Sequence, residues 1–70
     1  MGKVILYEHG CPNCLRLKKM LDAKHIEYED VTDQNLMRSM GFREAPKLEV
    51  DGVIMSFPDA KKWVEEQNNG

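Results

Sequence analysis

The chain has 70 residues and a net charge of −2 at pH 7, from ten Lys and Arg side chains against twelve Asp and Glu side chains. This length favours one domain covering residues 1–70, and without a block of basic residues we expect no nucleic-acid partner. The longest apolar run is far too short to cross a membrane, and Met1–Lys3 leaves no room for a signal peptide before that run. We therefore expect a cytoplasmic protein with no membrane partner.

The first half of the chain predicts a strand, a helix and a second strand. Val4–Tyr7 is apolar on both faces, as in a central strand that is covered on two sides. A helical pattern then runs from Leu15 to Lys24, with its apolar side chains on one face and Arg16, Lys18, Lys19 and Asp22 outward. Ile26–Glu29 alternates between apolar and polar residues, which predicts a second strand with one wetter face.

A second helix is predicted to follow this strand. Either Thr32 or Asp33 can cap its start, because both side chains accept hydrogen bonds from backbone N–H groups. Gly41 is placed to end it. Its apolar side is expected to consist of Leu36, Met37 and Met40.

The last part of the chain predicts a hairpin and a third helix. Lys47–Val50 and Val53–Met55 flank Asp51-Gly52, a pair that tolerates the positive φ angles of a type I′ turn. A final helix is then opened by Ser56, Pro58 and Asp59 and turns Ala60, Trp63 and Val64 inward. The predicted order of elements is βαβαββα.

The sequence Cys11-Pro12-Asn13-Cys14 stands between the first strand and the first helix. Two thiols three residues apart at a helix start can form one reversible disulfide. The unpaired N–H groups and positive dipole end of the helix favour a thiolate, and in such settings the pKa of cysteine falls from ~8.5 to roughly 3.5–7.5. A bridge over so short a loop stabilises little, and in the cytosol this motif is more often catalytic or metal-binding than structural. The motif therefore predicts thiol–disulfide exchange.

The whole pattern resembles the glutaredoxin family of the thioredoxin fold. The resemblance covers nearly the entire chain, from the CPxC motif at the first strand–helix junction to Ala45-Pro46 before the third strand and the Asp51-Gly52 hairpin. It implies an α/β fold with a four-stranded mixed sheet and three helices. It also implies a monomeric thiol–disulfide oxidoreductase that reduces protein disulfides or glutathione mixed disulfides. No bound cofactor is expected, although glutathione could serve as co-substrate.

Roles follow for the residues of the motif. Cys11 is the candidate nucleophile because it is the exposed cysteine at the helix end, and Cys14, one turn inside, is the candidate resolving thiol. Pro12 presets φ for the first helical turn and has no N–H to leave unpaired there. Asn13 stands where many glutaredoxins carry Tyr, so less aromatic cover is expected over the pair.

Substrate-binding residues are implied around the motif. In this family the proline that matches Pro46 is usually cis and lies beside the disulfide, where it exposes the backbone of the preceding residue, here Ala45. That backbone can pair with a peptide or with glutathione as a short strand would. His9, at the rim of the site, could stabilise the thiolate when protonated, and its alternative interpretation is a solvated loop side chain.

Departures from the family pattern leave the electron donor open. Glutathione-using members usually carry Lys three residues before the first cysteine, where this chain has Glu8, whose charge would also oppose a thiolate. They carry Gly-Gly where this chain has Ser56-Phe57. Asp59 and its helix N-terminus could still hold the ends of glutathione. However, Ser56–Asp59 is more similar to the thioredoxin-like glutaredoxins that serve ribonucleotide reductase and take electrons from thioredoxin reductase.

Two other classes of protein remain as alternatives. Heavy-metal-associated domains also place CxxC after a first strand, but their order is βαββαβ and they lack the proline within the pair. For zinc, only Cys11, Cys14, His9 and His25 could ligate, and His25 is a helix away, so no metal site is expected. An iron–sulfur cluster shared by two chains, which occurs in some glutaredoxins, is not excluded by Asn13. The last alternative is a docking module with vestigial thiols.

Overall fold

The computed structural model describes residues 3–67, and its elements follow the predicted order βαβαββα. None of the helices in this part of the chain is both long and apolar enough to span a membrane. The seven elements are β1 (Val4–Tyr7), α1 (Pro12–Ala23), β2 (Glu29–Val31), α2 (Gln34–Ser39), β3 (Lys47–Val50), β4 (Val53–Met55) and α3 (Phe57–Glu66).

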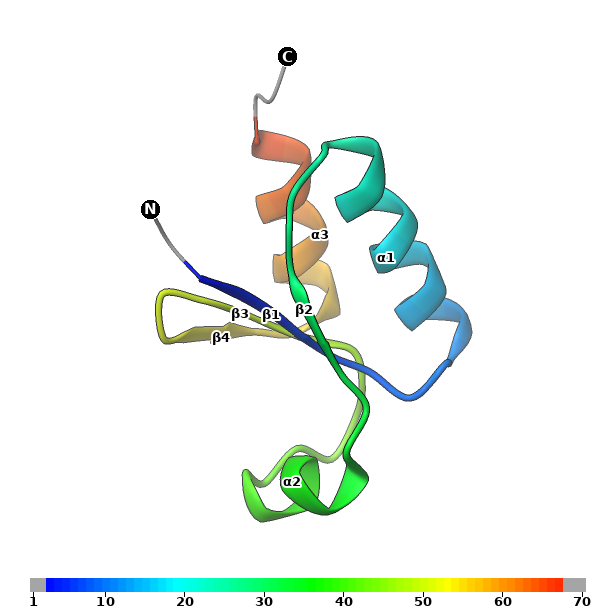
Figure 1. Cartoon of the computed structure of the whole chain (residues 1–70), viewed down its shortest axis with the longest axis vertical. Helices are drawn as coiled ribbons and strands as arrows, with labels where there is room; N and C mark the ends of the chain where they lie inside the picture. Colours follow the sequence, from blue (N-terminus) through cyan, green and yellow to red (C-terminus); the bar gives the residue numbers. More distant parts are fainter. Residues whose placement is uncertain (1–2, 68–70) are drawn as a thin grey trace.

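The four strands form one mixed sheet in the order β2-β1-β3-β4. β1 pairs in parallel with β2 and antiparallel with β3, so that Leu6 lies opposite both Asp30 and Leu48. β4 continues the sheet antiparallel to β3. In Figure 1, α1 and α3 lie side by side over the sheet, while α2 stands away from them at the other end of the molecule. The predicted α/β class, with a four-stranded mixed sheet and three helices, is confirmed.

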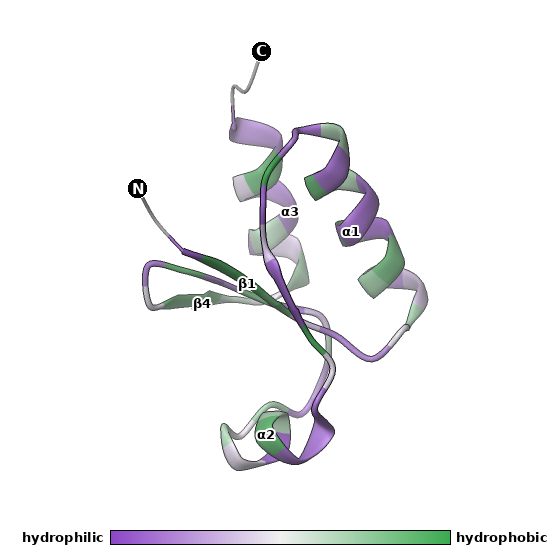
Figure 2. Ribbon diagram, viewed as in Figure 1, coloured by the Kyte–Doolittle hydropathy of each residue, from purple (hydrophilic) through white to green (hydrophobic). Residues whose placement is uncertain are grey.

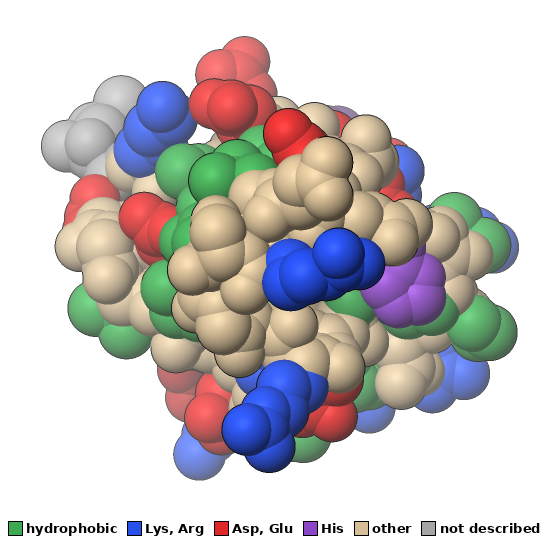
Figure 3. All heavy atoms as spheres, turned by 90° about the horizontal axis from the view of Figure 1, so that it is seen from below, with side chains coloured by type: hydrophobic (Ala, Val, Ile, Leu, Met, Phe, Trp, Pro, Cys, Tyr) green, Lys and Arg blue, Asp and Glu red, His purple; other side chains and the backbone are tan. Residues whose placement is uncertain are grey.

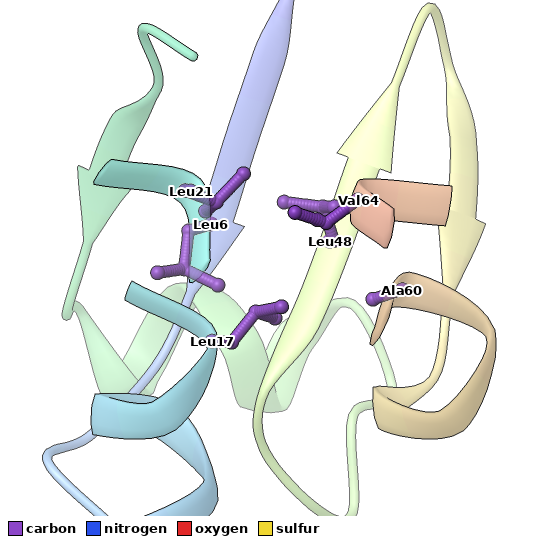
Figure 4. Close-up of a cluster of buried hydrophobic side chains, with 6 residues drawn as sticks. All are labelled: Leu6, Leu17, Leu21, Leu48, Ala60 and Val64. Carbon is purple, nitrogen blue, oxygen red and sulfur yellow. The ribbon is translucent and has the colours of Figure 1, made fainter. Parts of the chain in front are cut away.

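The core lies between the sheet and the pair α1 and α3. Its helical members are spaced four residues apart, which places them on one face of each helix, and Figure 4 shows the side chains pointing toward one another. Burying one large aliphatic side chain stabilises the fold by about 1.5–3 kcal/mol. The fully buried members are Leu6, Leu17, Leu21, Leu48, Ala60 and Val64.

The hairpin between β3 and β4 has the predicted turn. Asp51 and Gly52 both have positive φ angles, of 53° and 86°, as a type I′ turn requires.

Figure 2 shows the apolar character of β1 and β4 against the mixed character of α1 and α3. On β4, Val53 and Ile54 are exposed.

The first helix begins at Pro12, with Cys11 as its N-cap, as the roles of these two residues predicted; the apolar pattern alone, from Leu15, began three residues later. The predicted second strand is present, but its predicted bounds, Ile26–Glu29, are wrong, because β2 covers Glu29–Val31. The reason is the way α1 ends: His25 takes a left-handed conformation with φ of 57°, and the Ile26 N–H donates to the Leu21 carbonyl. The N–H of Ile26 is therefore used by the helix end, and its side chain packs on the core instead.

The second helix is shorter and less buried than predicted. Asp33 is its cap, with Oδ1 accepting from two backbone N–H groups, and Thr32 makes no capping bond. Met37 is buried, but Leu36 and Met40 are 43% and 38% exposed, so the expected apolar side is wrong for these two residues. A six-residue helix that stands off the sheet can bury little more than one side chain.

Two helix ends were predicted by their residues. Gly41, with φ of 81°, follows α2, and its N–H donates to the Arg38 carbonyl. Ser56 is the N-cap of α3, but its side chain makes no capping hydrogen bond, and only its carbonyl accepts, from the Ala60 N–H. Ala60 and Val64 are buried, as predicted from their spacing.

Candidate functional site

Cys11 and Cys14 form a disulfide at the start of α1. Cys11 is the N-cap residue, in extended conformation, and its Sγ accepts the backbone N–H of Cys14 at 3.1 Å. The two Cα atoms are 4.9 Å apart, within the usual range for a disulfide. The sulfur of Cys11 therefore takes the place that a Ser or Asp oxygen takes in other helix caps.

The two cysteines differ in exposure. Cys14 is completely buried, whereas Cys11 is partly exposed. The difference arises because Cys14 lies on the inward face of α1, three residues before the core residue Leu17, whereas Cys11 ends the loop from β1. An incoming sulfur atom therefore reaches Cys11 first.

The other two residues of the motif lie at the surface. Pro12 is the first residue of α1, where its fixed φ suits the helix, and both Pro12 and Asn13 are exposed. Neither side chain covers the disulfide with an aromatic ring. The pair is therefore open to solvent on the side of Cys11.

Ala45, the residue before Pro46, lies against the disulfide, although it is far from it in sequence. The Ala45 carbonyl oxygen is 3.8 Å from the Cys11 Sγ, across 34 positions of the chain. The Ala45–Pro46 peptide bond is cis, as the resemblance implied, and Pro46 is fully buried. The antiparallel pairing of β1 and β3 explains the contact, because Tyr7 lies opposite Lys47 and the end of one strand meets the start of the other.

Glu8 is a buried carboxylate in the loop that leads to Cys11. Only 2% of the residue is exposed. Its Oε1 accepts the Gly10 N–H at 2.7 Å, and its Oε2 lies 2.9 Å from the Lys18 Nζ. The same ammonium lies 2.8 Å from the Asp30 Oδ2. The prediction that Lys18 points outward is wrong, because its charge balances that of Glu8 and ties the loop to α1 and β2.

The ionisation of these groups reflects their contacts. Burial by itself would raise the pKa of Glu8, but hydrogen bonds with Asp30, Lys18 and the Gly10 N–H outweigh it, so this pKa lies below its usual 4.5. The pKa of Asp30 is raised, first by burial and then by the nearby Glu8. The bonds to Asp30 and Glu8 hold the pKa of Lys18 well above its usual value. Lys18 is therefore charged at neutral pH and holds the ionised Glu8 in place.

Sequence reasoning missed the pairing of Glu8 with Lys18, although a signal for it exists. Side chains two residues apart in a strand share a face, so Glu8 continues the face of the buried Leu6. A carboxylate on that face requires a partner from the covering element. Lys18, on α1, is that partner.

The remaining predicted residues are less closely joined. His9 is exposed and lies with Ala45 on the wall of one hollow. Asp59 is exposed in the first turn of α3, and within residues 3–67 no hydrogen bond or ion pair joins it to the disulfide. The structure thus brings together Cys11, Cys14, Ala45 and Pro46, and leaves Asp59 outside this group.

Cys11 and Cys14, once reduced, would offer two soft ligands at this site. Over residues 3–67, no group of three or more Cys, His, Asp and Glu side chains is arranged to hold a metal ion.

No protein-family model matches the chain, and no curated protein matches it. The chemistry of the site is therefore argued from its own geometry.

Proposed function

We propose that the chain is a thiol–disulfide oxidoreductase of the glutaredoxin type, with a thioredoxin fold. The observation that carries this proposal is the unequal pair at the start of α1. The Cys11 Sγ is accessible and accepts the Cys14 N–H, while Cys14 is completely buried. A hydrogen bond and a helix N-terminus directed at one sulfur favour its thiolate, which is the nucleophile in disulfide exchange.

The reaction proceeds in two exchanges. The Cys11 thiolate attacks one sulfur of a substrate disulfide, forms a mixed disulfide with it and releases the other substrate sulfur as a thiolate, which takes up a proton. Cys14 then loses its proton and attacks the Cys11 sulfur, which releases the second substrate thiol. Two electrons and two protons pass to the substrate, and the Cys11–Cys14 disulfide seen in the structure is the oxidised product.

The position of Ala45 supports a substrate groove beside Cys11. Its carbonyl oxygen is 3.8 Å from the reactive sulfur and belongs to an irregular segment outside the sheet ladder. An extended substrate segment could pair with this backbone while its cysteine faces Cys11. The mixed sheet and the βαβαββα order are compatible with the proposed thioredoxin fold.

Serine variants of the two cysteines test the proposal. We expect Cys11→Ser to abolish disulfide reduction and Cys14→Ser to accumulate the mixed disulfide, because only the second exchange is blocked. The measurement is the mass of the protein after mixing with a peptide disulfide, together with the rate of thiol release. Substantial activity in Cys11→Ser would show that the roles are assigned wrongly, and equal loss in both without a trapped adduct would reject the mechanism.

Thioredoxin reductase is the electron donor that we propose. Glu8, where glutathione-using glutaredoxins carry Lys, is buried against Lys18 and offers no cation to a glutathione carboxylate. The oxidised protein can be presented with NADPH through thioredoxin reductase, or through glutathione and glutathione reductase. Reduction only by the second route would reject this choice of donor and leave the exchange chemistry intact.

A metal carrier is the alternative with less support. Two thiolates could hold a soft ion, but the described residues add no third ligand near them. Elemental analysis of protein purified without oxygen separates the two functions, because a carrier would retain about one metal ion per chain or per pair of chains.

A further inference from the structure

A hollow of about 170 Å³ opens beside the disulfide. Its walls come from the loop before Cys11, from α2 and from the segment that leads to Pro46. Ala45 links this hollow to the reactive sulfur, because it lines the hollow and its carbonyl oxygen is 3.8 Å from the Cys11 Sγ. A substrate segment that pairs with the Ala45 backbone at Cys11 therefore lies next to a residue that lines this hollow.

The hollow combines an apolar floor with a basic rim. Met37 is buried, and the Phe42 ring packs edge-on against Tyr7 with centroids 5.1 Å apart. Arg38 and Arg43 are exposed and both line the hollow. Within residues 3–67 neither guanidinium belongs to an ion pair. Both arginines are therefore available to an anionic ligand.

The other titratable groups of the hollow leave an excess of positive charge. Glu44 is its one acidic lining residue, and the Glu44 carboxylate lies 3.9 Å from the Lys47 Nζ. His9, from the loop that leads to Cys11, also lines the hollow. Figure 3, seen from the side of α2, shows Lys and Arg side chains and a histidine gathered on this face of the molecule. The local charge is thus opposite to the net charge of −2 of the whole chain.

We propose that this hollow is a specificity subsite for an acidic side chain of a protein substrate, close in sequence to the cysteine that is reduced. The inference rests on the proposed function and adds the substrate class to it. A guanidinium binds a carboxylate through two parallel hydrogen bonds, and Met37 and Phe42 suit the methylene groups that carry it. An extended chain advances ~3.3 Å per residue, so we assign the subsite to an acidic residue one to three positions from the cysteine.

Peptide disulfides that differ in one residue test this inference. The peptides carry Asp, Asn or Lys two positions from the cysteine, on either side, and single-turnover reduction by the chemically reduced protein gives the second-order rate. We expect the better placed Asp peptide to react about three- to tenfold faster than its Asn counterpart, the range expected for one or two partly exposed ion pairs. The Lys peptide should be the slowest.

Variants of the two arginines test whether the preference for the Asp peptide arises in the hollow. Arg38→Gln with Arg43→Gln should bring the Asp and Asn peptides to equal rates, and Arg38→Glu with Arg43→Glu should favour the Lys peptide. Arg16→Gln is the matched control beside the motif, because Arg16 lies near Pro12 in a different hollow along α1. Lys62→Gln, on the exposed side of α3, also removes one positive charge, so Arg16→Gln combined with Lys62→Gln matches the two charges removed by the double arginine variant. Both controls should keep the preference.

The outcomes separate this inference from the proposed function. If no peptide is reduced by the native protein, the proposed function itself is rejected. If all peptides are reduced at equal rates, or if the preference for Asp survives removal of both arginines, only the subsite is rejected. The last substrate is the mixed disulfide of glutathione and the Asn peptide. If the two arginines change the reduction rate of this substrate alone, the hollow binds a glutathione carboxylate, and the proposal is overturned.

Discussion

Glu8 shows how a single charged residue fixes the loop that carries the reactive cysteine. Its side chain lies on the covered face of the sheet, with Leu6, where an isolated carboxylate would be costly. Lys18 and the Gly10 N–H satisfy its two oxygens. The Glu8 N–H also donates to the Val31 carbonyl. The loop from residue 8 to residue 11 is thus held from α1 and from β2, and its last residue presents the sulfur.

Replacing Lys18 with methionine should therefore destabilise the protein at neutral pH. A buried carboxylate without its partner costs about 1–3 kcal/mol, and a domain of this size loses about 4–8 °C of Tm for each kcal/mol. We therefore expect Tm to fall by roughly 4–24 °C in a thermal melt. Lys62→Met, which removes an exposed lysine of α3, is the control and should change Tm little.

The pH dependence of this loss has a definite sign. The pKa of Glu8 is lowered in the folded protein. The ionised Glu8 therefore stabilises the fold above pH 4.5, and this stabilisation is lost as the pH falls through the lowered pKa. The pKa of Asp30 is raised in the folded protein, so the ionisation of Asp30 lowers the stability of the fold above pH 3.8. Without Lys18 both carboxyls bind protons more tightly when folded, so the deficit of Lys18→Met should shrink in acid. A deficit that is as large at pH 3 as at pH 7 would contradict this account.

At the residue scale, the sequence predicted those parts of the candidate site that depend on the spacing of residues along the chain. The position of Cys11 and Cys14 at a helix start could be predicted because a strand, a CPxC motif and a helical pattern follow one another directly. The partner of Glu8 could not be predicted in the same way. Lys18 is ten residues away, at the edge of the buried face of α1, and only the three-dimensional path of the loop brings the Glu8 carboxylate to it.

Among the three helices, α2 is the one that the core holds least. Met37 is its one buried side chain, and the helix has six residues. The Asp33 Oδ1 accepts the N–H groups of Asn35 and Leu36, and these bonds supply much of the order at its start. Because Arg38 belongs to this helix, the geometry of the basic hollow depends on it.

Removing the cap of α2 should loosen this helix alone. An N-cap Asp→Ala change costs ~1 kcal/mol, which corresponds to about fivefold faster opening in local hydrogen exchange. We expect Asp33→Ala to accelerate exchange at the Met37 and Met40 amides and to leave the amides of α1 unchanged. Thr32→Ala is the matched control, because its side chain makes no capping bond. Equal effects of the two variants, or an effect that reaches α1, would contradict the assignment.

Element boundaries followed the sequence where local rules decide them. The turn at Asp51-Gly52 and the end of α2 at Gly41 depend on positive φ angles that few residues accept, so their residues predict them. The start of β2 depends instead on how α1 ends. His25 adopts the left-handed conformation that is usual for glycine or asparagine, and this tight end uses the N–H of Ile26. No pattern in Ile26–Glu29 carries that information.

For the whole molecule, the core and the proposed active site are one packing unit. Cys14, Leu17 and Leu21 lie at successive turns on the inward face of α1 and are all completely buried. A chain of 70 residues buries only about 60% of the surface that its unfolded form exposes. Each core side chain therefore carries a large share of the stability, and the burial of the resolving thiol depends on the same contacts.

Leu17→Ala should weaken both the fold and the protection of Cys14. Loss of a fully buried leucine costs ~2–5 kcal/mol, with the larger values where the cavity cannot collapse. We expect a lower denaturant midpoint, and faster alkylation of Cys14 in the reduced protein, because opening of the core is what exposes this thiol. Leu36→Ala removes an equal side chain from the exposed surface of α2 and should change neither quantity much. If Leu17→Ala lowered stability without changing the alkylation rate of Cys14, the resolving thiol would be protected locally, by the start of α1, and not by the core.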